Sequence, residues 1–187
     1  MKIVKQNNQS LKEVVDFLNS GGVVICPTDT VYGFLADLSN KKAVKKIYKI
    51  KNRLRSKPLP VFVKDVRMAK SLAEISDNQE KIIKKYWPGK YTFILKSKNC
   101  NSKTKNTIAL RIPDHKFLND LLKKINKPLA QTSVNISDCP PLTKIDKIIK
   151  IFGSMPGLDL IINAGNLPKR EPSKIIDLTS ECLTRLR

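Results

Sequence analysis

The chain has 187 residues, of which 41% are hydrophobic and 28% are charged, a balance typical of globular rather than disordered proteins. This length fits a single domain, residues 1–187, that is large enough to bury a hydrophobic core. The formal net charge of +20 either provides a field that attracts polyanions or reflects a general drift of the composition toward lysine.

Several classes of protein are disfavoured by what the sequence lacks. No apolar run approaches the ~20 residues that a membrane helix needs, and the polar N-terminal residues do not resemble a signal peptide, so we expect a cytoplasmic protein without a membrane partner. The cysteines at positions 26, 100, 139 and 182 are too scattered for a disulfide framework or a zinc site. Because His115 is the single histidine, neither a zinc enzyme nor a Ser-His-Asp hydrolase is expected, and we expect no metal ligands.

Hydrophobic periodicity, capping residues and breaks at Gly and Pro predict alternating helices and strands. The expected helices begin at or near Ser10, Asn40, Asp65, Ser76 or Asp77, Asp114 and Thr143. The expected strands span residues 23–26, 61–63, 91–96, 107–112, 129–133, 158–162, 174–178 and 183–186, with a hairpin formed by the third and fourth. The elements interleave without a strict βαβ rhythm, which predicts one α/β domain with a mixed sheet.

The segment Pro27–Gly33 follows directly on the first expected strand. Its proline ends that strand because it has no N–H for a ladder. Two threonine hydroxyls, a carboxylate and a phenol then occur within a few residues, and ligand sites of open α/β sheets gather outside strand ends. A Pro-Thr-Asp turn with a self-bonding Asp side chain is the simpler structural interpretation.

Two pairs of polar residues suggest contacts to an anion. Glycine-rich phosphate loops are absent from the sequence, so side chains would have to hold a phosphate. Lys51 and Arg53 lie just after an expected helix and could converge on one anion, although the helix dipole alone also favours basic residues there. Ser133 and Asn135 share one face of a strand end, where they could contact ligand oxygens or simply begin a turn.

Further short motifs occur with these segments in a fixed order. They are Lys51-Asn52-Arg53 with Lys57-Pro58-Leu59, Trp87-Pro88-Gly89, Thr107–Pro113, Thr132–Asn135 and Pro172–Leu178. Together with Pro27–Gly33, this set resembles the YrdC/TsaC family of threonylcarbamoyl-AMP synthases, in its stand-alone form without a C-terminal domain. The resemblance runs from Pro27 to the C-terminus.

The resemblance implies a fold and an activity. The fold would be an open, twisted sheet with a concave ligand-binding face lined by the motifs. The enzyme would make threonylcarbamoyl-AMP and pyrophosphate from L-threonine, bicarbonate or CO2 and ATP, with Mg²⁺ accompanying the ATP. That reaction begins N6-threonylcarbamoyladenosine formation on tRNA, so a downstream threonylcarbamoyl transferase and weak binding of tRNA or other RNA are implied as partners.

The resemblance also assigns roles to residues. The catalytic residues would be Lys51, Arg53, Ser133 and Asn135. The same four would bind ATP together with Thr107, Pro141 and Arg185. Threonine would be bound by Thr30, Tyr32, Arg111, Gln131 and Ser173, with the Arg111 guanidinium as the partner of its carboxylate.

Two segments depart from the family pattern. Ser137-Asp138-Cys139 stands where the Ser-x-Asn motif is normally followed by a glycine, although Asp tolerates a left-handed backbone better than most residues. Arg185 is followed by only two residues, where the family usually has a short tail that contains glycine.

Two other functions are open from the sequence alone. A non-catalytic RNA-binding or ribosome-assembly factor could use the same basic concave surface, and the charge supports it. The aromatic content of 6% counts against it, because few aromatic side chains are left for base stacking. A different carbamoyl-transferring enzyme with the same domain would need further modules.

Overall fold

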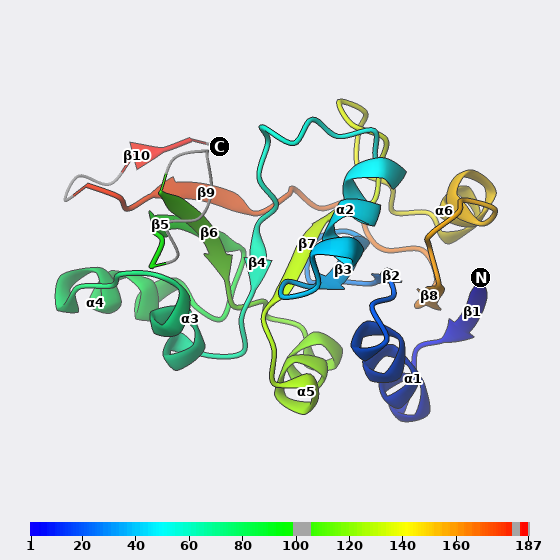
Figure 1. Ribbon diagram of the computed structural model, residues 1–187, viewed down its shortest axis with the longest axis horizontal. Coiled ribbons are helices and arrows are strands. Elements are labelled where there is room, and N and C mark those ends of the chain that lie inside the picture. The colour runs from blue at the N-terminus through cyan, green and yellow to red at the C-terminus, as the bar shows by residue number, and fades with distance from the viewer. Residues whose placement is uncertain (99–105, 181–183, 187) are drawn as a thin grey trace.

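The computed structural model describes residues 1–98, 106–180 and 184–186. These residues form six helices and ten strands (Figure 1). The helices are α1 (Asn8–Asn19), α2 (Lys41–Ile50), α3 (Val66–Leu72), α4 (Asp77–Tyr86), α5 (Lys116–Ile125) and α6 (Ile145–Phe152). The strands are β1 (Lys2–Lys5), β2 (Val24–Cys26), β3 (Gly33–Asp37), β4 (Val61–Phe62), β5 (Tyr91–Lys96), β6 (Thr107–Arg111), β7 (Leu129–Ser133), β8 (Leu160–Asn163), β9 (Lys174–Asp177) and β10 (Thr184–Arg185).

All strands of the described residues join one sheet, in the order β1-β8-β2-β3-β7-β4-β6-β5-β9-β10. The pairs β1–β8, β2–β8, β4–β6 and β5–β9 are parallel. The remaining pairs are antiparallel. The sheet is open, with β1 and β10 as its edges, which confirms the α/β fold with a mixed sheet and flanking helices.

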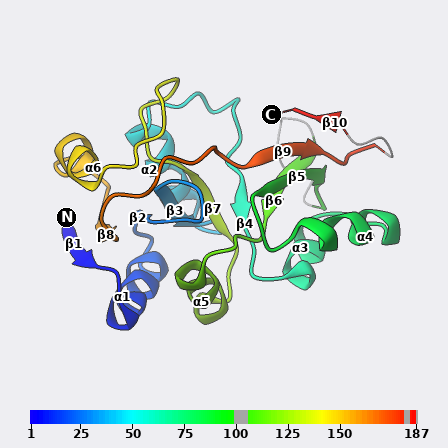
Figure 2. The ribbon, with the colours of Figure 1, turned by 180° about the vertical axis from the view of Figure 1, so that it is seen from behind.

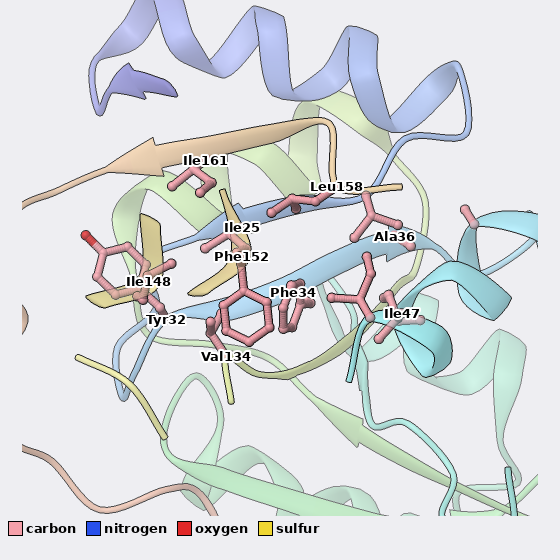
Figure 3. Close-up of a cluster of buried hydrophobic side chains, with 14 of the residues drawn as sticks. Ile25, Tyr32, Phe34, Ala36, Ile47, Val134, Ile148, Phe152, Leu158 and Ile161 are labelled. Carbon is pink, nitrogen blue, oxygen red and sulfur yellow. The ribbon is translucent and has the colours of Figure 1, made fainter. Parts of the chain in front are cut away.

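One apolar cluster joins α2 and α6 to the sheet (Figure 3). Phe34 of β3 and Phe152 of α6 pack edge to face, with ring centroids 5.2 Å apart, the arrangement that aromatic quadrupoles favour. Ile47 of α2 lies on the same cluster. The helical spacing of apolar residues that predicted α2 therefore places the apolar face of the helix on the sheet and its lysines outside.

A second cluster lies on the opposite face of the same strands. Successive residues of a strand point to opposite faces, and Leu35, next to Phe34, packs against α1 and α5 rather than α2 and α6. The two helices lie side by side in Figures 1 and 2. A third cluster packs α3 and α4 against β4, β5 and β6.

Strand pairing shows which face is left open for a ligand. Val61 of β4 pairs with Ala130 of β7. Val61 belongs to the cluster under α3 and α4, and Ala130 to that under α2 and α6, so these four helices cover one face. On the other face, α1 and α5 pack over β8, β2 and β3 and reach Phe62 of β4. Among the described residues, no helix packs over the side chains of β6, β5 and β9 on that face, and the candidate site lies there.

The structure confirms most expected elements and corrects several. The strands β1 and β3 were not predicted from the sequence. The N-cap of α1 is Asn7, whose side chain accepts from Ser10 N at 2.7 Å, so Ser10 is the third helical residue rather than the cap. Helix α5 begins after His115 and not after Asp114, and α6 begins after Lys144. The caps Asn40, Asp65 and Ser76 are as expected.

Candidate active site

A cavity of about 460 Å³ lies on the open face of the sheet. Its floor consists of side chains from β5, β6 and β9, among them Ile94, Ala109 and Ile175. Three loops complete its walls: residues 28–33, residues 51–60 and residues 133–141. Each loop follows or precedes a buried strand or helix, so the rigid sheet determines where its polar side chains lie.

The first wall is the loop of residues 28–33, which leads into β3 and belongs to the Pro27–Gly33 motif. The Thr28 hydroxyl is 2.6 Å from Val31 O and 3.0 Å from the Thr30 hydroxyl. Because Thr28 has a single hydroxyl proton, which Val31 O accepts, Thr30 is the donor between the two hydroxyls. The lone pairs of Thr30 then remain available to a ligand. A Cβ on Gly33 would lie 3.3 Å from Thr28 Cγ2, so glycine allows this close approach of the loop to β3.

Lys51, Ser133 and Asn135 come together but turn their donors toward one another. Lys51 Nζ donates to Ser133 O at 2.5 Å, Asn135 O at 3.0 Å and Asn135 Oδ1 at 2.7 Å. Ser133 Oγ also donates to Asn135 Oδ1, at 2.7 Å. All three ammonium protons are therefore used within the protein. The direct contacts of Lys51 to phosphate and carbamate that the sequence predicted are not what this arrangement provides.

The buried position of Lys51 changes its chemistry. The residue is 1% exposed, and burial together with the Arg53 guanidinium lowers the pKa of Lys51 to about 7. The oxygen partners favour the charged form and act in the opposite direction. The ammonium is thus a buried, titratable charge whose protonation responds to an anion placed nearby.

Asn135 holds the third loop in shape. Its amide nitrogen donates to Ile136 O at 2.9 Å and to Cys139 O at 2.7 Å. This loop includes Asp138, whose φ of 66° is left-handed. Asp138 therefore adopts the backbone conformation for which the family's usual glycine is suited. Ser137 N donates to Lys51 O at 3.0 Å, so the two loops at this end of the cavity are joined.

Arg53 offers a free edge to the cavity. Its Nε donates to Lys57 O at 2.9 Å and its Nη2 to Pro58 O at 3.1 Å. Its Nη1 has no partner among the residues that the structure describes. Burial lowers the pKa of Arg53, and Asp138 opposes that shift. A guanidinium anchored by two backbone carbonyls is a preorganised partner for an anionic oxygen.

Arg111 has an internal partner that the sequence did not predict. Its Nη2 lies 2.6 Å from Asp29 Oδ2, and its Nε donates to Gly89 O at 2.9 Å. The two side chains are 2% and 5% exposed. Asp29 Oδ2 also accepts from Asp114 N at 3.2 Å. The guanidinium lines the cavity, with Nη1 as the nitrogen left for a ligand in the described structure.

Tyr32 uses its hydroxyl for contacts within the protein. The phenol donates to Gly165 O at 2.7 Å and accepts from Ala164 N at 3.0 Å. Figure 3 shows the oxygen pointing away from Phe34 and Phe152, at the edge of the cluster. Burial raises the pKa of the Tyr32 phenol. The hydroxyl therefore links the loop of residues 28–33 to residues 164–165, while the assignment of Tyr32 to threonine binding stays a prediction.

Most predicted site residues do meet at one cavity. The predicted residues that line it are Thr30, Tyr32, Lys51, Arg53, Arg111, Gln131, Ser133, Asn135, Pro141 and Ser173. Thr107 shares a face of β6 with Ala109 but is not in the cavity lining, and Arg185 lies in β10 opposite Ile176, with its side chain outside the described part. The sequence analysis missed Asp29 as the partner of Arg111, although it lies in the first motif. It also missed Ala109 and Ile175, which period-2 spacing from Arg111 and Ser173 would have found.

The described residues contain no group of three or more His, Cys, Asp and Glu side chains suited to hold a metal ion. His115 lies half-buried before α5, where burial lowers its pKa. None of the helices in the described part of the chain is long and apolar enough to cross a membrane. The charged groups of the cavity are mainly cations, which suits a ligand rich in anionic oxygens.

Fold and site together define an α/β protein whose open sheet carries a cavity in which most of the charged lining side chains are cationic. A family model with the description "Telomere recombination" matches residues 16–187. The chain therefore belongs to the Sua5/YciO/YrdC family, as the sequence motifs indicated.

Relatives and solved structures agree with that membership. A protein of Methanocaldococcus jannaschii is 36% identical over 193 residues, which cover 100% of this chain and 91% of that protein. The threonylcarbamoyl-AMP synthase of Bacillus subtilis is 33% identical over 76% of this chain, but only 43% of its own length is covered. Sua5 of Pyrococcus abyssi, solved in complex with L-threonine, superposes with a TM-score of 0.89 at 28% identity and covers 100% of this chain and 56% of its own. The chain thus spans about half the length of these last two proteins.

Proposed function

We propose that this chain is a threonylcarbamoyl-AMP synthase, which makes threonylcarbamoyl-AMP and pyrophosphate from L-threonine, bicarbonate or CO2 and ATP. The observation that carries the proposal is one cavity in which Arg53 and Arg111 each present a free guanidinium edge beside a set of hydroxyls. The synthase name of the B. subtilis relative and the threonine in the P. abyssi Sua5 structure support it.

Threonine fits the part of the cavity near β6. Arg111 Nη1 would bind its carboxylate, and Asp29 would hold the guanidinium in position from behind. Thr30 has lone pairs for the amine or hydroxyl of the substrate, and Gln131 and Ser173 line the same region. Ser173 Oγ lies 2.9 Å from Thr92 Oγ1, so its position is set by β5. These contacts would orient the amine toward the other end of the cavity.

The nucleotide fits the end formed by residues 51–60 and 133–141. Arg53 Nη1 would contact phosphate oxygens. Lys51 would act through the field of its buried charge and by holding the Ser133–Asn135 segment, rather than as a hydrogen-bond partner of the ligand. Pro141 lines this end of the cavity, where an apolar ring face suits a nucleobase.

The reaction needs charge neutralisation more than acid–base groups. The threonine amine would attack CO2, lose a proton and form a carbamate. A carbamate oxygen would then attack the α-phosphorus of ATP, and the bond from that phosphorus to the oxygen bridging to the β-phosphorus would break, releasing pyrophosphate. Two anions must approach each other, so preorganised cations and the exclusion of water are the main contributions of the protein.

Mg²⁺ enters this proposal as part of the ATP substrate. The cavity contains one carboxylate among its described lining residues, that of Asp138, and this set does not fit a resident Mg²⁺ cage. Mg²⁺ is commonly bound by substrate phosphates and waters with few protein ligands. The ion would then screen the charge of the phosphates, and the side chains described above would bind and orient the complex.

The test is pyrophosphate release from ATP, measured with and without threonine and bicarbonate. The expected result is release that requires both. Release that ignores threonine would refute the synthase proposal. Serine should be a poorer substrate, because the loss of one methyl contact costs ~1–3 kcal/mol. A reducing cytoplasm is the compartment that this proposal implies, and the acceptor of the product would be a threonylcarbamoyl transferase that acts on tRNA.

The net charge of +20 favours one rival, a non-catalytic RNA-binding or ribosome-assembly factor. Lys51→Ala and Arg53→Ala separate the two functions when both properties are measured at one fixed salt concentration. For an enzyme, each variant should lose roughly 10²–10³-fold in turnover, while RNA affinity barely changes because two of 36 basic residues contribute little to it. If the wild-type chain shows no reaction with ATP and both variants clearly lose RNA affinity, the RNA-binding function is favoured.

A further inference from the structure

Asp138 is an unusual residue for its position in the cavity wall. Its backbone has a φ of 66°, a left-handed conformation that side chains other than Asn, Asp and Gly rarely adopt. Its side chain is 80% exposed and lines the cavity between Ser137 and Cys139. Among the described lining residues it is the only acidic one. A carboxylate in a strained position, inside a cavity for anions, calls for a role of its own.

The contacts of Asp138 leave half of its carboxylate available. Lys57 Nζ lies 3.2 Å from Oδ1, and Oδ2 has no partner in the part of the chain that the structure describes. An ionised carboxylate can only accept hydrogen bonds. Phosphates, the carbamate and the carboxylate of threonine are acceptors too and would be repelled. The ligand group that meets Asp138 must therefore be a donor.

Within a nucleotide, the donors nearest to the phosphates are the ribose hydroxyls. Lys57 Nζ lies 3.2 Å from Asp138 Oδ1, and the Arg53 guanidinium interacts electrostatically with the same carboxylate. These two cations near Asp138 would attract the phosphate chain. Pro141 lies beyond it along the loop and suits the base. The sugar connects the two, so it would lie against the carboxylate. A single Asp or Glu that accepts from a ribose hydroxyl is a common solution in nucleotide sites.

We propose that Asp138 binds the ribose of the nucleotide substrate, with Oδ2 accepting a hydrogen bond from the 2′- or 3′-hydroxyl. The proposal rests on the function proposed above, since it needs a nucleotide at this end of the cavity. Asp138 is then a specificity-determining residue, which favours ribonucleotides over deoxyribonucleotides. Lys57 holds the carboxylate and compensates its charge, so that the cavity still accepts phosphates.

The test compares the affinities of ATP, 2′-deoxy-ATP and 3′-deoxy-ATP by titration calorimetry without threonine. The wild-type chain should bind ATP about tenfold more tightly than at least one deoxy analogue, because a hydrogen bond to a charged group is lost. Asp138→Gly suits the left-handed backbone and should fold normally. This variant should bind all three nucleotides with equal affinity, because only the nucleotides that carry the bonded hydroxyl lose affinity.

Lys57→Ala is the matched control, because it removes the ion pair and leaves the carboxylate. It should keep the preference for ATP. Equal weakening of all three nucleotides in Asp138→Gly would assign the residue to loop support only and overturn the proposal. A wild-type chain that binds inosine triphosphate more weakly than ATP, but binds both deoxy analogues as tightly as ATP, would place the base at Asp138. That result would overturn the proposal as well. A wild-type chain that does not bind ATP would refute the proposed function itself.

Discussion

The buried pair of Asp29 and Arg111 allows a prediction whose magnitude follows from the structure. Both side chains are at most 5% exposed, and the ion pair measures 2.6 Å. Removing one partner of such a pair leaves an uncompensated buried charge, which typically costs ~3–5 kcal/mol. Asp29→Asn keeps the shape and one acceptor for the guanidinium, so we expect the lower end, a loss of about 3 kcal/mol in the free energy of unfolding.

The assay is a double-mutant cycle by urea denaturation, with Asp29→Asn, Arg111→Met and the combined variant. At about 2–4 °C per kcal/mol for a chain of this size, the single Asp29→Asn variant should also melt roughly 6–12 °C lower. The double variant should recover much of the loss, because both charges are gone and an apolar side chain fills the site. The coupling energy should be about 2–3 kcal/mol.

An exposed ion pair of the same chain provides the control. Lys116 and Asp120 lie 2.9 Å apart on α5 but are 90% and 39% exposed, so Asp120→Asn should leave the free energy of unfolding almost unchanged. The reasoning is refuted if Asp29→Asn is as mild as the control. It is also refuted if the two single losses simply add, since the pair would then carry no energy of its own.

Three further predictions concern single side chains. Because the pKa of Lys51 is about 7, the side chain is mostly neutral at pH 8, and a bound nucleotide should raise that pKa. Calorimetry in two buffers of different ionisation enthalpy should therefore show proton uptake approaching one per ATP. Proton uptake that persists in Lys51→Met would contradict this. Tyr32→Phe should lose ~1–3 kcal/mol of stability, because Ala164 N and Gly165 O lose their partner, without a change in threonine affinity; the reverse result would make the phenol a ligand contact. Arg111→Lys should weaken threonine binding more than ATP binding, because lysine lacks the planar fork; equal losses in a titration would exclude this role.

Helices were predictable because their signals are local. Asn40 accepts from Lys42 N and Ala43 N at the start of α2, and such a cap can be recognised without tertiary information. The strand β3 was missed because all five of its residues are buried, so it shows no alternation. The strand β1 has exposed lysines at both ends and is defined only by its pairing with β8.

The motifs predicted which residues meet, but not how they contact one another. Lys51 and Asn135 were both assigned to the site, yet two of the three oxygens around the ammonium are backbone carbonyls, which carry no mark in a sequence. The partners of the Tyr32 hydroxyl lie more than 130 positions along the chain. Such contacts depend on the register of the sheet, so sequence spacing alone could not distinguish a ligand contact from a structural one.

The topology of the sheet has a consequence for how the site comes into being. Lys174 of β9 pairs with Tyr91 of β5, and Leu160 of β8 pairs with Lys2 of β1, so the sheet is assembled from parts that lie far apart in the sequence. Folds dominated by such contacts form slowly, because loop closure must precede the contacts that reward it. The cavity needs Ser173 and Ile175 as part of its lining, so a chain still emerging from the ribosome has no complete cavity until residue 175 has been made. Any ligand of the completed cavity therefore acts on the folding equilibrium of the entire domain and favours the finished fold over every partial one.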